Sequence, residues 1–166
     1  CTWPDPAMAA GNDRVRLRSV RVHPENGSPS DLVTMQMPLV IETEYWNLVP
    51  DSQLHTTLHV YNEQGIVAFS AFPMDQAEWH GRSFPRGLFR SVCRIPGDLL
   101  NSGLYRVTLL VVKDGSSVIY RHEDIVSFEV VDTSARQGAW YGKEPGVVHP
   151  QLEWTTVYLG EADITI

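Results

Sequence analysis

Short runs in which hydrophobic and polar residues alternate cover most of this chain, and turn residues separate one run from the next. Between positions 54 and 61, Leu54, Leu58 and Val60 alternate with polar residues, which is the two-residue period of a strand with one buried face. The same pattern predicts strands over 14–22, 32–46 with a break at Pro38, 54–61, 66–72, 88–95, 104–112, 117–121 and 125–131. No comparable run has the period of an amphipathic helix. The chain is therefore predicted to be all-β, with the fold of an immunoglobulin-like antiparallel β-sandwich.

Two local patterns add detail to this sandwich. The first strand needs a bulge if its four apolar residues are to share one face, namely Val15, Leu17, Val20 and Val22. Later, a turn and Gly103 come before Leu104 and Tyr105, at the start of the strand over 104–112. This arrangement is similar to the tyrosine corner at which a late strand of an immunoglobulin-like sandwich begins.

Turn-rich segments mark the ends of the predicted domain. Residues 1–13 are rich in Pro, Ala and Gly and are expected to be a linker, and residues 14–132 are expected to form the sandwich. Residues 133–166 are expected to be a tether followed by one more β segment, which can fold back on its own sheet or pair with a second copy of the chain. The residues expected to take part in strand exchange are Trp140, Leu152, Trp154 and Val157.

Charge and cysteine content narrow the function classes. The 166 residues carry a formal net charge of −7, which argues against binding nucleic acid because a polyanion is not attracted to an acidic body. Two cysteines, Cys1 and Cys93, do not form a disulfide framework, so a reducing, cytoplasmic location is expected. No apolar run approaches the ~20 residues that span a bilayer. Because the first residue is a cysteine rather than Met, we expect the chain to be a piece of a longer protein.

A cluster of arginines in the first strand is the exception to this acidic character. We expect these charges to protect the edge of a sheet from pairing with other chains. The residues are Arg14, Arg16, Arg18 and Arg21.

Candidate catalytic groups are few. The sequence contains no phosphate-binding loop, nucleophile elbow or Cys-x-x-Cys pair. His55 and His59 share a strand face, but four residues of strand span about 13 Å, too far for both to bind one metal ion directly. Glu42 and Glu44 lie about 7 Å apart on one face, a spacing compatible with glycoside hydrolysis, although any alternating strand produces such pairs. We therefore expect a protein that is not an enzyme and has no metal and no cofactor, with a carbohydrate-active enzyme as an alternative.

The outward face of the predicted sheet has better candidates for binding. Sugars are bound by aromatic rings that cover the apolar side of the sugar ring and by polar groups that bond its hydroxyls. Two expected neighbouring strands carry such residues on one face, and the predicted carbohydrate-binding set is His55, Thr57, His59, Tyr61, Arg106 and Thr108. The alternative is that this face is only solvated.

The end of the chain carries a family signature. The tail reads Gly138-x-Trp140-x-Gly142-Lys143-x-Pro145-Gly146-Val147-Val148-His149-Pro150-x-Leu152-x-Trp154. Upstream, four features follow one another in a fixed order: Leu39-x-Ile41-x-Thr43-x-Tyr45, the Asn62–Gly65 hairpin, Leu99–Val107 and Val126-x-Phe128-x-Val130. Together these features resemble the C-terminal carbohydrate-binding domain of Wzt-type proteins, the ATPase subunits of ABC transporters that export O-antigen polysaccharide.

The resemblance implies a sandwich that dimerises by exchanging its C-terminal strand. It also implies recognition of the finished end of a lipid-linked glycan in the cytoplasm, at the inner face of the inner membrane. The implied partners are the O-antigen polysaccharide, a second copy of the chain, the ATPase domain of the same full-length protein and the transporter membrane subunit. The family's ATP-hydrolysing domain is not in this sequence, so no ATPase activity is expected of it. The alternative is a structural or adhesion-type β-sandwich that has no sugar ligand.

Overall fold

The computed structural model of the protein contains two β-sheets, and it describes residues 1–50, 52–73, 82–133, 145–150, 152–153 and 155. Among these residues the strands are β1 (Val15–Pro24), β2 (Val33–Thr34), β3 (Leu39–Asn47), β4 (Leu54–Asn62), β5 (Val67–Ala71), β6 (Gly87–Ile95), β7 (Gly103–Lys113) and β8 (Ser117–Val131). One sheet has the order β1-β3-β6 and the other has the order β2-β8-β7-β4-β5. All neighbouring strands are antiparallel except the short β2, which runs parallel to β8. The predicted all-β sandwich is confirmed.

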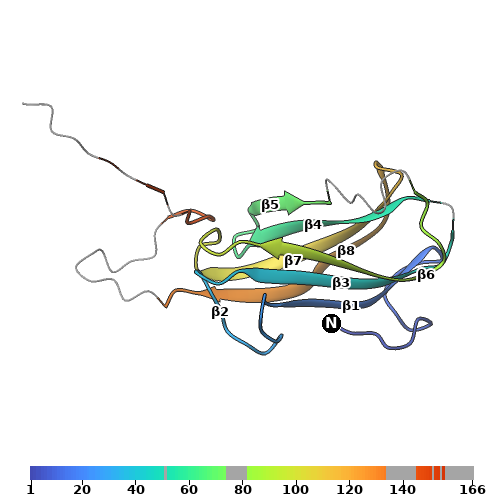
Figure 1. Ribbon diagram of the computed structural model, residues 1–166, viewed down its shortest axis with the longest axis horizontal. Helices are drawn as coiled ribbons and strands as arrows, with labels where there is room; N and C mark the ends of the chain where they lie inside the picture. The colour runs from blue at the N-terminus through green and yellow to red at the C-terminus, as the bar shows by residue number, and fades with distance from the viewer. Residues whose placement is uncertain (51, 74–81, 134–144, 151, 154, 156–166) are drawn as a thin grey trace, which may run out of the picture.

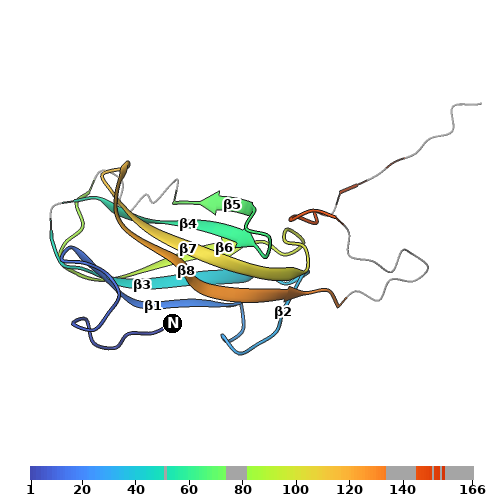
Figure 2. The same ribbon diagram turned by 180° about the vertical axis from the view of Figure 1, so that it is seen from behind.

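The two sheets pack face to face around one hydrophobic core (Figure 1, Figure 2). Leu39 and Ile41 of β3 contribute from one side, and Leu109 and Val111 of β7 contribute from the other; all four are at most 3% exposed. Burying each such side chain stabilises the fold by about 1.5–3 kcal/mol, so the alternation seen in the sequence is also the main source of stability. No part of the chain that the structure describes forms a helix long and apolar enough to cross a membrane.

The first strand has the bulge that its sequence requires. The pairing of β1 with β3 shifts register between Leu17 and Ser19, and Val15, Leu17 and Val20 are all 0% exposed. The extra residue restores the inward direction of the later apolar side chains. β1 also lies at an edge of its sheet, as its arginines predicted.

One long strand replaces two predicted ones. The sequence predicts separate strands over 117–121 and 125–131, but β8 continues from Ser117 to Val131. Asp124 adopts a positive φ of 49°, and the pairing with β7 shifts between Val107 and Leu109. A bulge of this kind absorbs polar residues without ending the strand, so the prediction of a break at the polar segment is wrong.

The loop before β6 contributes to the core, although its sequence is mostly polar and does not alternate. Phe84 is 5% exposed, and its ring centre lies 4.8 Å from that of Phe89. Its backbone N–H donates to the Ser52 carbonyl at 2.9 Å. A single aromatic residue within a polar segment is thus buried by a local β-bridge that the alternation pattern does not reveal.

Residues 1–13, expected to be a linker, lie against the sandwich. The terminal ammonium of Cys1 donates to the Val20 carbonyl at 2.9 Å, and the amide of Asn12 donates to the Ile119 carbonyl at 2.7 Å. Close approach to β1 requires a glycine at position 11, where φ is 152° and an added β-carbon would lie 2.2 Å from the Val15 carbonyl oxygen. The small residues that suggest a linker also permit this close packing.

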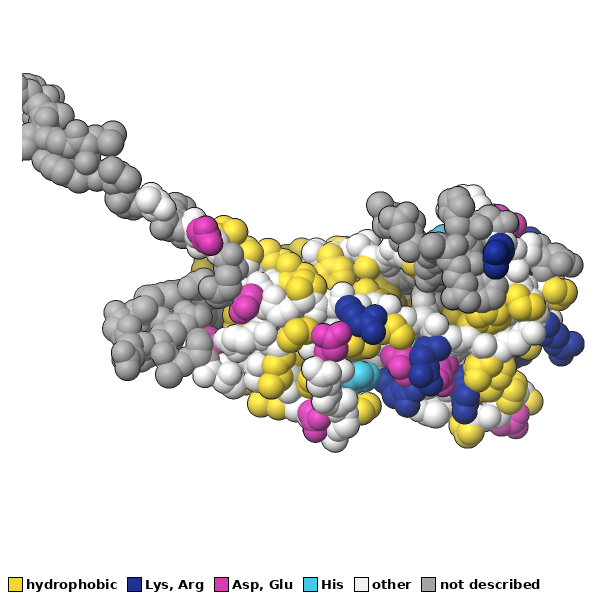
Figure 3. Space-filling model, in the orientation of Figure 1, with side chains coloured by type: hydrophobic (Ala, Val, Ile, Leu, Met, Phe, Trp, Pro, Cys, Tyr) yellow, Lys and Arg dark blue, Asp and Glu magenta, His cyan; other side chains and the backbone are white. Residues whose placement is uncertain are grey.

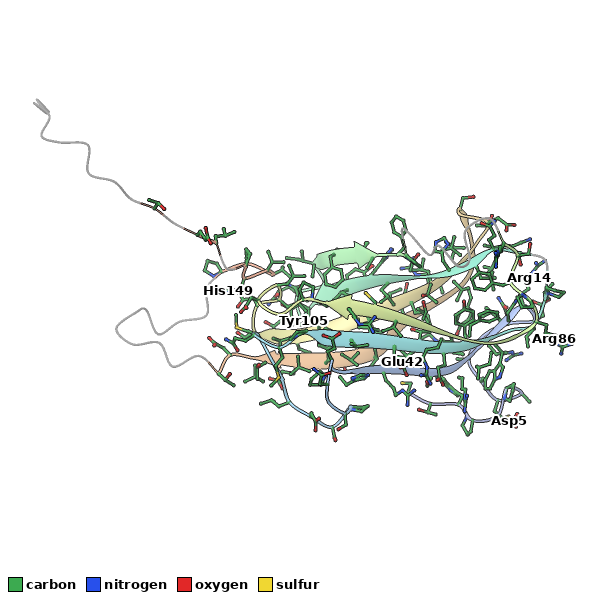
Figure 4. The ribbon with its side chains drawn as sticks, in the orientation of Figure 1. Asp5, Arg14, Glu42, Arg86, Tyr105 and His149 are labelled. Carbon is green, nitrogen blue, oxygen red and sulfur yellow. The ribbon has the colours of Figure 1, made fainter. Side chains whose placement is uncertain are left out.

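The tail returns to one end of the sandwich. Val148 forms a β-bridge with Leu100, and the N–H of His149 donates to the Leu99 carbonyl at 2.9 Å. Figure 4 shows Tyr105 and His149 at the same end of the molecule. Of the residues expected to take part in strand exchange, Trp140, Trp154 and Val157 lie outside the described residues, and Leu152 is 66% exposed.

Tyr105 connects the tail to the sandwich. Its hydroxyl lies 2.9 Å from the Asn101 carbonyl, which is the hydrogen bond expected of a tyrosine corner, and 2.9 Å from the Val147 carbonyl. The Asn101 amide donates to the Gly146 carbonyl at 2.9 Å. The corner therefore fixes both the start of β7 and the returning segment.

Candidate functional site

The predicted carbohydrate-binding residues lie together on the outward face of the five-stranded sheet. In the antiparallel pairing of β4 with β7, Tyr61 is opposite Arg106 and His59 is opposite Thr108. The burial pattern of β4 alternates along the strand, so His55, Thr57, His59 and Tyr61 share the face that points away from the core. Directly opposite side chains on one sheet face have β-carbons about 4.5–5.5 Å apart, close enough for one sugar to touch both.

The centre of this face is less open than the sequence predicts. Thr108 is only 2% exposed, and the next outward residues of β7, Leu110 and Val112, are 6% and 7% exposed. A side chain this buried has little surface to offer a ligand. The accessible part of the predicted set is therefore the β4 row together with Arg106, and Thr108 is a supporting residue beneath it.

Arg106 is held by an ion pair that the sequence did not reveal. Its Nη1 donates to Oδ2 of Asp124 at 2.7 Å, with side chains 38% and 51% exposed. Asp124 occupies the bulge of β8, and that bulge places its carboxylate beside β7. An exposed pair of this kind contributes little to stability, but it orients the guanidinium. The polar interruption His122-Glu123-Asp124 was the only signal in the sequence.

The aromatic groups of the face are arranged in two contacts. The rings of His59 and Tyr61 meet edge to face with centres 6.4 Å apart, and the ring of His55 lies 6.3 Å from that of Phe72. Burial lowers the pKa of His55, so its imidazole is neutral at neutral pH and offers one donor and one acceptor. Among the described residues, no cluster of three potential ligands could hold a metal ion.

A pocket with a mixed polar and apolar lining lies at the end of the face. It has a volume of about 370 Å³ and is lined by the hairpin residues Asn62, Glu63 and Gln64, by Ser102, and by the returning tail at Pro145 and Val147. The hairpin is near the predicted site, because a β-carbon added to Gly65 would lie 3.9 Å from Nη2 of Arg106. The sequence could not indicate this pocket, because it forms only where the tail meets the hairpin. The candidate site is thus an open face that continues into a pocket.

The alternative catalytic pair is on the other sheet, and its environment is unsuited to hydrolysis. Nε and Nη2 of Arg90 donate to Oε1 of Glu44 at 2.9 and 2.6 Å, and Arg21 forms an ion pair with Glu42. The hydrogen bond from Arg90 holds the pKa of Glu44 below its ordinary value against the opposing effect of burial. A general acid for glycoside hydrolysis needs a raised pKa, so Glu44 does not suit that role.

The ionised Glu44 leads to a prediction about acid sensitivity. Replacing Glu44 with Gln should destabilise the fold by about 2 kcal/mol at pH 7, because three arginines then share one carboxylate. A depressed pKa stabilises the fold above the ordinary glutamate value of about 4.3, and this stabilisation is lost as pH falls through the lower folded value. The free energies of unfolding of wild type and Glu44→Gln, measured by urea unfolding, should therefore differ less below pH 4 than at pH 7. A difference that stays constant would contradict this assignment.

Comparison with solved structures places the fold. The crystal structure of the C-terminal domain of wzt matches 89% of this chain and 86% of its own length, with a TM-score of 0.64 and 14% sequence identity. This chain has the fold of the Wzt C-terminal domain. A β-glucuronidase from glycoside hydrolase family 2 matches 63% of this chain and 10% of its own length, with a TM-score of 0.42 and 16% identity. No protein-family profile and no curated protein matches the sequence.

Proposed function

We propose that this chain is a non-catalytic domain that binds O-antigen polysaccharide for export by an ABC transporter. The observation that carries this proposal is the opposition of Tyr61 and Arg106 on an accessible sheet face. The fold shared with the C-terminal domain of Wzt supports the transport context, and so does the tail signature. In this context the chain works in the cytoplasm at the inner membrane, beside the ATPase domain of the same full-length protein and the transporter membrane subunit.

Each side chain of the face has a separate task in binding a sugar. The Tyr61 ring covers the apolar side of a sugar ring, and Arg106, oriented by Asp124, donates hydrogen bonds to hydroxyls. His59 and the neutral His55 accept or donate according to the hydroxyl they meet. The neighbouring pocket of about 370 Å³ receives the end of the glycan, because it closes the face on one side.

The test is direct binding of glycans to the purified chain. An array of bacterial O-antigen polysaccharides identifies the cognate glycan, and its oligosaccharide is then titrated while backbone amide NMR signals are followed. The expected result is saturable binding, with shifts concentrated in β4, β7 and the 62–66 hairpin. Absence of binding to any polysaccharide, or shifts confined to the three-stranded sheet, would reject the proposal.

We also propose that the tail joins two copies of the chain through Trp140, Leu152, Trp154 and Val157. The segment 145–149 is held at the tyrosine corner, so the chain beyond it continues from a fixed point. Leu152 is 66% exposed, so its apolar side chain is available for burial by a partner. Pairing of two copies also multiplies weak glycan contacts, which suits a polymeric ligand.

Deletion of residues 150–166 is expected to convert a dimer into a monomer. The shortened chain keeps the bonds between residues 145–149 and the Leu99–Asn101 turn, so its unfolding midpoint should stay close to that of the full chain. Sedimentation velocity gives the mass of both chains, and circular dichroism supplies the folding control. A full chain that is already monomeric, or a shortened chain that remains dimeric, would contradict strand exchange.

A further inference from the structure

The outward face of the three-stranded sheet carries an unbalanced ion cluster. Three arginines (Arg18, Arg21 and Arg90) lie within 4 Å of two carboxylates, those of Glu42 and Glu44. Three positive and two negative charges leave a surplus of one positive charge in a chain whose net charge is −7. Figure 3 shows Lys or Arg and Asp or Glu side chains gathered on this face with a histidine beside them.

A pocket of about 290 Å³ opens beside this cluster. It is lined from β1 by Arg21 and His23, from β3 by Glu42, from β6 by Arg90, and from the turn after β1 by Ser28. This volume is at the lower limit for small-molecule sites, so it suits a single small polar molecule. It lies on the sheet opposite the proposed glycan face and shares no residue with it.

The two arginines of the pocket have donors to spare. Arg90 uses Nε and Nη2 on Glu44, and Arg21 uses Nη2 on Glu42 and Glu44. Within the part of the chain that the structure describes, Nη1 of Arg90 and Nη1 of Arg21 have no hydrogen-bond partner. The Ser28 hydroxyl lies 2.8 Å from that of Ser30 and adds a group that can donate or accept.

We propose that this pocket binds a sugar acid, with its carboxylate between Arg21 and Arg90. The cluster already accommodates two carboxylates on guanidinium groups, and the unused Nη1 donors of Arg21 and Arg90 can bond a third. Guanidinium and carboxylate match as planar partners, which gives such a pair strength and direction. Ser28 and His23 also line the pocket, and both side chains can bond hydroxyls, so the ligand is a hydroxylated acid rather than a simple anion.

The net charge of the molecule explains why such a site must be local. An acidic protein repels anions from its surface as a whole, so an anion binds only where guanidinium donors are left free to bond it. Because Glu44 is 6% exposed, it keeps Arg90 in position while remaining shielded from a ligand. The site therefore selects one negative charge rather than a polyanion.

Titration with glucuronate, followed by amide NMR at low salt, tests the proposal. Glucuronate should shift the signals of Arg21, Ser28 and Arg90, whereas glucose, its neutral counterpart, should not. Arg90→Gln should weaken glucuronate binding at least about fivefold. Arg94→Gln is the matched control, since Arg94 lies on the same strand but pairs with Glu25 at 3.0 Å, and its effect should be below about twofold. Tyr61→Ala should leave glucuronate binding unchanged, which separates this site from the glycan face.

Several outcomes would overturn the assignment. Equal losses in Arg90→Gln and Arg94→Gln would indicate diffuse attraction instead of a site. Inorganic phosphate binding as tightly as glucuronate, or vesicles containing phosphatidylglycerol binding in its place, would reject a sugar acid as the ligand. If Arg90→Gln does not fold, Arg90→Lys replaces it in the test, because Lys keeps the positive charge beside Glu44. Loss of the planar guanidinium should still weaken glucuronate binding. Unchanged glucuronate affinity in Arg90→Lys would contradict the proposal.

Discussion

Replacing Tyr61 with Ala is expected to lower affinity for the cognate glycan at least about tenfold, because an aromatic face and its hydrogen-bonding edge are lost together. The ring lies opposite Arg106 and beside His59, whose smaller imidazole covers less of a sugar ring than the phenol does. Tyr61→Phe keeps the ring and should retain most of the affinity. Isothermal titration with the oligosaccharide selected on the array measures both variants.

Replacing Arg106 with Ala should produce a comparable loss for a different reason. The guanidinium supplies charge-assisted hydrogen bonds, each contributing about 1.5–3 kcal/mol, and Asp124 would be left without its partner. Arg94→Ala removes a similar charge from the other sheet and serves as the matched control. Binding that both Tyr61→Ala and Arg106→Ala leave undiminished would refute the choice of this face.

Replacing Tyr105 with Ala is expected to destabilise the fold by about 4 kcal/mol, a larger effect than that of Glu44→Gln. Tyr105 is 1% exposed, and its ring stacks on Phe128 with centres 5.4 Å apart. Tyr105→Phe keeps that packing and removes only the hydroxyl, so its effect should be about 1–2 kcal/mol. Urea unfolding of the two variants separates the contribution of the ring from that of the hydroxyl.

The Tyr105 hydroxyl remains a donor throughout the usual pH range. Burial, assisted by the charge of Glu63, raises the pKa of Tyr105 to about 12. Wild type and Tyr105→Phe should therefore differ in free energy of unfolding by about 1–2 kcal/mol at every pH between about 6 and 9. An equal loss of stability in Tyr105→Phe and Tyr105→Ala would show that the ring contributes nothing.

Most of the sandwich could be predicted because its strands bury one face. Alternation in β3 and β4 indicated the correct inward residues, and the required bulge in β1 followed from the spacing of its apolar residues. The break predicted within β8 failed because a bulge and a turn have the same polar composition. What separates them is the hydrogen-bond pairing with β7, which is a tertiary property.

The sequence could predict which residues of the candidate site share a sheet face, but not which of them are accessible. Alternation placed Tyr61 and Arg106 on one face, but it could not show that Thr108 is buried at the centre of that face. The partner Asp124 and the pocket at Val147 both depend on contacts between distant segments. Local sequence patterns do not predict contacts between segments that are far apart in the chain.

The pocket at the end of the glycan face is built partly by the hairpin and partly by the returning segment. Val147 accepts a hydrogen bond from the N–H of Asn101 and also lines the pocket together with the hairpin residues Asn62 and Glu63. A molecule that binds the pocket through this segment also stabilises the contact between the segment and the sandwich. By thermodynamic reciprocity, that contact strengthens binding of the molecule by the same free energy. Ligand binding in the pocket and docking of the returning segment on the sandwich are consequently coupled equilibria.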